Sequence, residues 1–189
     1  MNFGEDIKDS LETLRSGGII LYPTDTIWGI GCDATNQQAV EKIFRIKSRE
    51  ENKSLLVLVN GDSMIDRYVQ DIPEVVFELT SVSDSPLTII YPKGKNLAKG
   101  VCAEDGSIGI RICNDEFCNE LISRFRKPIV STSANFSGKP SPENFDKIEK
   151  SVIDAVDYVV KYRQDDRRKQ TASPVIRVEL NGTIKIIRK

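Results

Sequence analysis

The sequence contains no histidine among its 189 residues. Without an imidazole, the chain cannot use a histidine-based catalytic triad, a histidine metal ligand or a histidine general base. It also lacks a strong net charge, because 27 lysines and arginines nearly balance 28 aspartates and glutamates. Bulk charge therefore predicts neither a nucleic-acid partner nor a membrane partner. Any chemistry must rely on lysine, arginine, carboxylates, hydroxyls, backbone dipoles or a carboxylate-bound metal.

Cysteine pairs and long apolar runs are also missing. The four cysteines form no C-x-x-C pair, so we expect reduced, structural thiols. The first residues lack a basic start followed by an apolar core, and no apolar run approaches a membrane span. We therefore expect a cytoplasmic protein without a membrane partner, and the chain length fits one domain over residues 1–189.

Nucleotide-binding signatures are weak. The chain has no P-loop motif, and Gly29-x-Gly31-x-x-Ala34 matches the dinucleotide fingerprint only loosely. A true fingerprint follows its strand directly and opens a helix at once, whereas here the next predicted helix begins near Asn36.

Strands and helices are predicted to alternate without a strict period. Apolar runs predict strands at 19–22, 55–59, 87–91, 108–112, 128–130, 156–161, 175–180 and 184–187. Helical spacing and cap residues predict helices at 6–15, after Asn36, within 62–82 with a break near Pro73, at 115–125 and from Ser141 onward. An Asn181-Gly182 turn joins the last two strands. This order favours a mixed α/β or α+β sheet over a regular doubly wound fold.

The most informative segment for function runs from residue 22 to residue 31. It follows a buried apolar run, and Pro23 ends the hydrogen-bond ladder because it has no N–H group. Two threonines, one aspartate and two glycines follow at the exit of the strand. Hydroxyls, a carboxylate and bare backbone at such a place suit a small polar ligand, although a plain polar turn is the alternative.

Three other segments carry basic or hydroxyl groups, and each has a purely structural alternative. Lys47, Arg49 and Lys53 follow a predicted helix, where they either clamp phosphates or complement the helix dipole. Residues 131–138 are dense in hydroxyls, which is typical of an anion-binding nest or of an ordinary turn. Ser107 and Arg111 share one face of a strand, and the arginine there holds an anionic ligand or forms a salt bridge.

Taken together, these segments resemble the YrdC-like family, the threonylcarbamoyl-AMP synthases. The resemblance rests on Tyr-Pro-Thr-Asp-Thr-Ile-Trp-Gly-Ile-Gly (22–31), Ile-Phe-Arg-Ile-Lys-Ser-Arg (43–49), Ser-Pro-Leu-Thr (85–88), Ile-Gly-Ile-Arg (108–111), Ser-Thr-Ser-Ala-Asn-Phe-Ser-Gly (131–138) and Ala-Ser-Pro-Val-Ile (172–176). It implies an α/β fold of the YrdC-like or DHBP-synthase-like kind. In that fold, a twisted sheet of mixed parallel and antiparallel strands is flanked by helices and has a concave basic surface.

The resemblance also implies an activity and partners. The reaction joins L-threonine, bicarbonate and ATP to give threonylcarbamoyl-AMP, pyrophosphate and water, with Mg²⁺ as the cofactor that accompanies ATP. A downstream threonylcarbamoyl transferase complex then uses the product to modify tRNA. Direct contact with tRNA or double-stranded RNA is a further partner that the family suggests.

Roles for single positions follow from the same resemblance. Catalytic roles fall on Lys47 and Arg49. Threonine-binding roles fall on Thr26, Arg111, Ser131 and Ser173. ATP-binding roles fall on Arg49, Lys53, Ser107, Ser133, Asn135, Ser141 and Arg188. No protein-bound metal site is implied. Leu58 and Pro174 depart from the family pattern, since some relatives have histidine and threonine there.

Two other functions remain open from the sequence. The first is a non-catalytic module that binds double-stranded RNA or tRNA through the same basic concavity. The second is a carbamoyl-transfer domain of the type found within larger hydrogenase-maturation proteins. Pyrophosphate release that depends on ATP and threonine separates the synthase from the RNA-binding module. The absence of an accessory zinc or acylphosphatase-like region argues against the carbamoyl-transfer domain.

Overall fold

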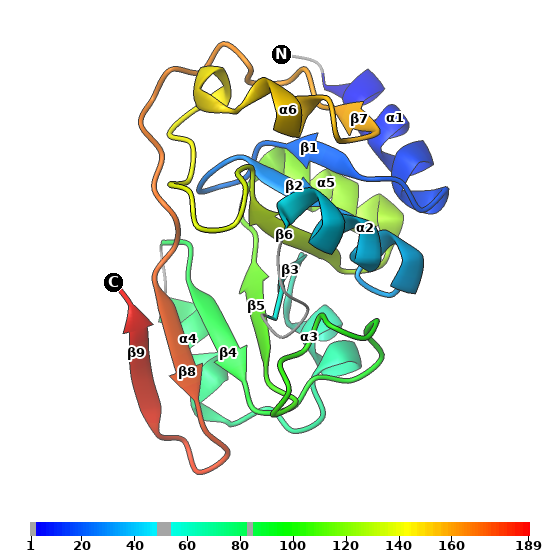
Figure 1. The fold of residues 1–189 in the computed structure, drawn as a ribbon. Helices are drawn as coiled ribbons and strands as arrows, with labels where there is room; N and C mark the ends of the chain where they lie inside the picture. Colours follow the sequence, from blue (N-terminus) through cyan, green and yellow to red (C-terminus); the bar gives the residue numbers. More distant parts are fainter. Residues whose placement is uncertain (1–2, 49–53, 83–84) are drawn as a thin grey trace.

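The computed structural model describes residues 3–48, 54–82 and 85–189, which form one nine-stranded sheet flanked by helices (Figure 1). The first half of the chain contains α1 (Gly4–Arg15), β1 (Ile20–Tyr22), β2 (Gly29–Gly31), α2 (Gln37–Lys47), β3 (Leu56–Val59), α3 (Asp62–Tyr68), α4 (Val75–Val82) and β4 (Thr88–Tyr91). The second half contains β5 (Ile108–Ile112), α5 (Glu116–Phe125), β6 (Ile129–Ser133), the 3₁₀ turn η1 (Phe145–Lys147), α6 (Lys150–Ile153), β7 (Tyr158–Val159), β8 (Val175–Val178) and β9 (Ile184–Arg188).

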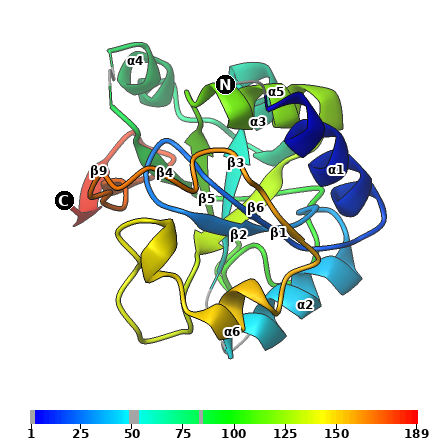
Figure 2. The same cartoon turned by 90° about the horizontal axis from the view of Figure 1, so that it is seen from above.

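The sheet mixes parallel and antiparallel neighbours in the order β7-β1-β2-β6-β3-β5-β4-β8-β9. The pairs β1–β7, β3–β5 and β4–β8 are parallel, and the other pairs are antiparallel. Seen from above, α1, α3, α4 and α5 lie on one side of the sheet, and α2 and α6 lie on the other (Figure 2). The predicted α/β fold with a mixed sheet is therefore confirmed.

Helix α2 begins at Asn36, the cap that the sequence predicts, and α5 begins after Asp115, which was predicted as the first helical residue and is the cap. The side chain of Asn36 accepts a hydrogen bond from the Ala39 N–H, and the side chain of Asp115 accepts one from the Cys118 N–H. Each such cap typically stabilises a helix by about 1 kcal/mol. Both helices bury residues spaced three and four apart, so the caps also set which face packs on the sheet. Within the described ranges, no helix combines the length and apolar character needed to cross a membrane.

Three predicted elements differ from the structure. Residues 141–144 form no helix: the Glu143 carbonyl accepts a hydrogen bond from the distant Gln170 N–H, and the chain bends at residues 143 and 144. Residues 29–31, predicted as open backbone, form β2 because β1 and β6 supply ladder partners on both sides. For the same reason β6 extends to Ser133, three residues beyond the predicted strand. The glycines of residues 29–31 therefore sit in an antiparallel sheet and not in a dinucleotide loop.

The four cysteines are free thiols, as the sequence predicts. Cys32, Cys113 and Cys118 are buried in the apolar core. Burial raises the pKa of the Cys32 thiol, and burial together with the neighbouring Cys113 raises the pKa of the Cys118 thiol. Cys32 and Cys118 therefore stay protonated near neutral pH and act as small apolar side chains.

Gly31 lies where no side chain fits. A Cβ atom there would come 2.5 Å from the Val130 carbonyl oxygen and 2.6 Å from the Tyr22 ring. We expect Gly31→Ala to lower the free energy of unfolding by about 1–3 kcal/mol, because strands β1 and β6 must move apart. Gly109→Ala is the matched control, since its Cβ would meet nothing closer than 3.8 Å. Urea unfolding checks this prediction, and equal midpoints for the two variants would contradict it.

Candidate functional site

A cavity of about 710 Å³ opens on one face of the sheet. Its walls come from segments far apart in the sequence, from Thr26 near the start to Arg188 near the end. Among the described residues, its charged lining consists of three arginines and two carboxylates, namely Arg111, Arg177, Arg188, Glu104 and Asp105. The volume lies within the range of roughly 300–1,000 Å³ that is typical of small-molecule sites.

The strand register arranges the cavity floor in two rows, because residues paired across neighbouring strands share a face. The first row contains Ser131, Leu56, Gly109, Ile90 and Arg177. The second row starts at Leu58, which is buried beside the cavity, and continues through Arg111, Thr88, Val175 and Arg188. The first row is apolar in its middle and has a gap at the glycine. The second row has polar residues in its middle, and we call it the polar row.

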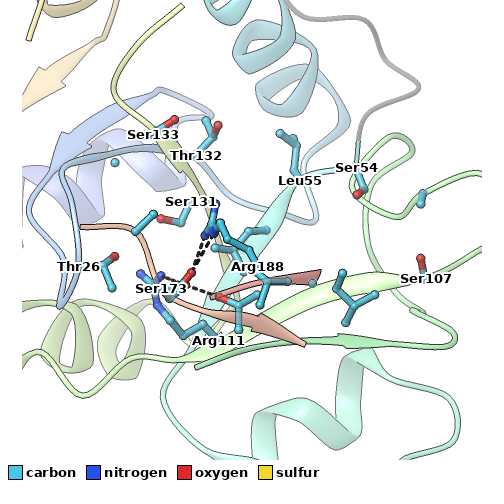
Figure 3. Close-up of a pocket in the computed structure, with 18 of the residues that line it drawn as sticks. Thr26, Ser54, Leu55, Ser107, Arg111, Ser131, Thr132, Ser133, Ser173 and Arg188 are labelled. Carbon is cyan, nitrogen blue, oxygen red and sulfur yellow. Dashed lines mark hydrogen bonds between the residues drawn. The ribbon is translucent and has the colours of Figure 1, made fainter. Parts of the chain in front are cut away.

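Arg111 is the centre of the polar row (Figure 3). Its side chain is only 4% exposed, and one of its terminal nitrogens lies 3.0 Å from an oxygen of Asp25. The guanidinium also donates hydrogen bonds to the hydroxyls of Ser173 (3.2 Å) and Thr24 (3.4 Å). The Ser173 hydroxyl lies 2.7 Å from that of Thr88, so four side chains hold the guanidinium in place.

The guanidinium keeps unused hydrogen-bonding capacity. Its Nε is buried and has no hydrogen-bond partner within the described residues. A buried donor without a partner costs free energy, so the arrangement favours a ligand that accepts a hydrogen bond there. A planar guanidinium is well suited to hold a carboxylate or a phosphate.

The hydroxyl of Thr26 faces the cavity. The neighbouring Thr24 hydroxyl donates its one proton to the Ile27 carbonyl oxygen, at 2.8 Å. The Thr24 oxygen accepts hydrogen bonds from the Thr26 N–H at 3.1 Å and from the Arg111 guanidinium at 3.4 Å, which use its two lone pairs. The Thr26 hydroxyl lies 3.1 Å from that of Thr24 and lines the cavity, where its oxygen can accept a hydrogen bond from a ligand.

Ser107 lies at the opposite end of the cavity from Thr26 (Figure 3). Its hydroxyl donates to Asp105 at 2.6 Å, and its N–H donates to the same oxygen at 2.9 Å. These two bonds, with a third from Arg177, lower the pKa of Asp105 to about 2. Asp105 therefore stays ionised at neutral pH and fixes the orientation of the serine.

Arg188 reaches the cavity through a β-bulge. In the pairing of β8 with β9, Ile176 faces Ile186 but Val175 faces Arg188, so Ile187 is the extra residue. A regular strand would place Ile187 on the cavity face and Arg188 on the opposite face. The bulge reverses this, and the Arg188 guanidinium donates to the Ser173 carbonyl oxygen at 2.6 and 3.1 Å.

Most of the residues singled out from the sequence lie together. The cavity is lined by Thr26, Ser107, Arg111, Ser131, Ser133, Ser141, Ser173 and Arg188. Arg49 and Lys53, which the resemblance placed at the phosphates, lie outside the described residues.

Lys47 and Asn135 do not line this cavity. The Lys47 ammonium is buried and donates to the backbone oxygens of Ser133 and Asn135 and to the Asn135 side chain. Asn135 is also buried, and its amide donates to the Lys139 carbonyl oxygen. In this structure the lysine therefore stabilises the backbone of the serine segment through its hydrogen bonds to residues 133 and 135.

Several residues of the site were not predicted from the sequence. Thr88, Asp105 and Arg177 line the cavity. Thr88 belongs to the Ser-Pro-Leu-Thr segment that the family resemblance includes, so this segment could have predicted it as a site residue. Asp105 and Arg177 carried no such signal, because only the pairing of β4 with β8 brings them together, at 2.8 Å.

The two positions that depart from the family pattern have clear places. Leu58 is fully buried beside Arg111 and does not line the cavity. Pro174 has no N–H, but its carbonyl oxygen accepts a hydrogen bond from the Thr88 N–H. Within the described ranges, no group of three or more cysteines or carboxylates forms a metal site.

Comparison with known proteins connects this geometry to a family. Residues 12–189 match the family model Sua5_yciO_yrdC, described as "Telomere recombination". The threonylcarbamoyl-AMP synthase of Pseudoalteromonas translucida is 30% identical over 181 residues, which cover 94% of this chain and 95% of that protein.

Solved structures show a similar fold. E. coli YciO superposes with a TM-score of 0.83 at 23% identity, covering 98% of this chain and 89% of that one. P. abyssi Sua5 complexed with L-threonine superposes with a TM-score of 0.82 at 24% identity and covers 92% of this chain. The chain described here spans about half of the P. abyssi protein, at 51%.

Proposed function

The chain belongs to the Sua5, YciO and YrdC family, and from this premise we propose that it is a threonylcarbamoyl-AMP synthase. The enzyme joins L-threonine, bicarbonate and ATP and releases threonylcarbamoyl-AMP, pyrophosphate and water. The structural observation that carries this function is the buried Arg111, which is held among hydroxyls at one end of a long cavity.

We assign L-threonine to the end of the cavity that contains Thr26. Arg111 would hold the carboxylate, since a fixed guanidinium recognises a planar anion. The Thr26 oxygen would accept a hydrogen bond from the amino acid, and Ser131 and Ser173 lie on the same side (Figure 3). P. abyssi Sua5, which has a similar fold, has been crystallised with L-threonine, and this supports threonine as the amino-acid substrate.

We assign ATP to the remainder of the cavity. Ser107 stands at the far end, and Ser133, Ser141 and Arg188 line the walls between the two ends. The apolar floor around Gly109 suits a flat base, and Arg188 suits a phosphate. This arrangement brings the α-phosphate near the amino acid, where the two substrates must meet.

The chemistry needs little from protein acids and bases. The threonine amine and bicarbonate combine to a carbamate with loss of water. A carbamate oxygen then attacks the α-phosphorus. The bond between the α-phosphorus and the oxygen that bridges to the β-phosphate breaks, and pyrophosphate leaves. The protein contributes positioning and charge stabilisation, which arginines and hydroxyls supply without histidine.

Three further parts of this proposal rest on the family resemblance. Mg²⁺ would enter with ATP as part of the substrate and neutralise phosphate charge. Glu104 and Asp105 line the cavity, and Mg²⁺ commonly takes one or two protein carboxylates beside phosphate oxygens and water.

The product would pass to a separate transferase complex that modifies tRNA. Direct contact of this chain with tRNA is the third part.

Thr26→Val tests the threonine end of the site. The substitution keeps the side-chain volume but removes the oxygen that accepts a hydrogen bond. We expect the KM for L-threonine to rise by about tenfold, with little change in the KM for ATP. Steady-state pyrophosphate release at varied threonine and at varied ATP measures both constants. An unchanged KM for threonine would remove Thr26 from the substrate site.

Pyrophosphate release from ATP tests the function as a whole. The assay contains bicarbonate and is run with L-threonine, with L-serine or with no amino acid. We expect release that requires both bicarbonate and L-threonine. Absence of release from protein shown to be folded would overturn the synthase function, and a salt-dependent tRNA titration would then test the RNA-binding alternative.

A further inference from the structure

Strand β9 is an open edge of the sheet. Within the described residues it pairs only with β8, and all five of its residues are exposed (Figure 1). Its hairpin also carries four of the five exposed large apolar side chains in the described chain, namely Leu180, Ile184, Ile186 and Ile187. An edge strand with unpaired backbone N–H and C=O groups can accept another strand.

The two faces of β9 differ in chemistry. Lys185 faces Arg177, and Arg188 faces Val175, so both cations lie on the cavity face. Ile184 faces Val178 and Ile186 faces Ile176, so these isoleucines lie on the opposite face. The edge is therefore basic on one side of the sheet and apolar on the other.

The positive charge on the cavity face is only partly neutralised. Glu179 lies 3.2 Å from Arg177 and 3.6 Å from Lys185, so one carboxylate serves two cations. Asp105 pairs with Arg177 as well, but within the described residues no carboxylate other than Glu179 lies within ion-pair distance of Lys185, and none lies within that distance of Arg188. A segment that pairs with β9 would therefore meet uncompensated positive charge on one face.

We propose that β9 binds an extended segment of a partner protein in which acidic and apolar residues alternate. Such a segment would add to the sheet as a tenth strand. Its side chains would point alternately to the two faces, so the acids would meet Lys185 and Arg188 and the apolar residues would cover the isoleucines.

A second copy of this chain is a poorer occupant of the same edge. Every charged residue from Ile184 to Lys189 is a cation, so pairing β9 with its own copy would bring like charges together. The bulge at Ile187 also interrupts the ladder, which limits indiscriminate pairing of edges. Charge complementarity therefore favours an acidic partner. This inference does not depend on the reaction proposed for the cavity.

The test uses three synthetic peptides with blocked ends and the full-length protein labelled with ¹⁵N. The first peptide alternates glutamate and valine, the second alternates lysine and valine, and the third has the composition of the first in two blocks. We expect only the first to bind and to slow amide hydrogen exchange within residues 184–189, by at least about tenfold. The amides of β7 at the other edge serve as the internal control.

Charge reversal provides the matched variants. Lys185→Glu is expected to weaken binding of the acidic peptide by at least about tenfold and to create binding of the lysine peptide. Lys189→Glu is the matched control, because Lys189 follows Arg188 and alternation along the strand directs it away from the cavity face, so binding of the acidic peptide should change little. Both side chains are exposed, so the amide spectrum is expected to show an unchanged fold.

Three results would overturn the proposal. The first is a lack of protection of β9 by the acidic peptide. The second is equal protection by the acidic and lysine peptides, which would show that charge does not select the partner. The third is protection of β9 without peptide, together with a doubled mass in sedimentation, which would assign the edge to a second copy of the chain.

Discussion

Arg111→Lys is expected to lower kcat/KM for L-threonine by at least about 100-fold, which corresponds to about 2.7 kcal/mol of transition-state stabilisation. Lysine keeps the positive charge beside the buried Asp25 but loses the planar fork that holds a carboxylate. It also loses the simultaneous hydrogen bonds to Ser173 and Thr24. Lysine is chosen because an uncharged residue at this position would leave the Asp25 carboxylate unpaired and destabilise the fold.

The measurement is threonine-dependent pyrophosphate release, combined with urea unfolding of each variant. Arg167→Lys is the matched control, since it makes the same chemical change in an exposed ion pair with Asp146, outside the cavity lining. We expect this control to retain full activity. If Arg111→Lys kept a wild-type kcat/KM for threonine, Arg111 would not be the carboxylate ligand.

Gly109→Val is expected to remove most of the activity without unfolding the protein. A Cβ at this position meets Leu56 and Thr88 at 3.8 Å, which is ordinary contact, so the strand accepts the side chain. Valine also favours strand backbone. Its methyl groups would fill the gap in the apolar row of the cavity floor, where we place the base of ATP.

We expect a loss of at least about tenfold in kcat/KM for ATP, with the free energy of unfolding changed by less than about 1 kcal/mol. Gly109→Ala adds one carbon and should fall between valine and the wild type. Pyrophosphate release at varied ATP gives the ranking. Full activity in the valine variant would show that no substrate occupies the space above Gly109.

Local signals predicted much of this fold. Asn36 and Asp115 cap helices because their side chains bond to the backbone three residues later, a contact that needs no distant partner. The Asn181-Gly182 turn is equally local, and Gly182 adopts a positive φ of 81°. Elements that depend on such short-range chemistry were found in the right places.

Elements that depend on distant partners were not predicted. Residues 29–31 become a strand only because β1 and β6 flank them. Residues 141–144 form no helix, since the Glu143 carbonyl bonds to the distant Gln170 N–H. The same limit applies to the site. Spacing along one strand placed Ser107 and Arg111 in the cavity, but the bulge that turns Arg188 inward arises from pairing between two strands.

The order of strands in the sheet has a consequence for how the protein folds. β1 pairs with β7, and β4 pairs with β8, so neighbours in space lie more than 80 residues apart in the chain. Long loops must close before these contacts can form, and a high contact order slows folding. During synthesis, the cavity would stay incomplete until β8 and β9 have emerged from the ribosome. The nascent chain would thus carry residues 22–31, part of the end of the cavity to which we assign threonine, well before the cavity is complete.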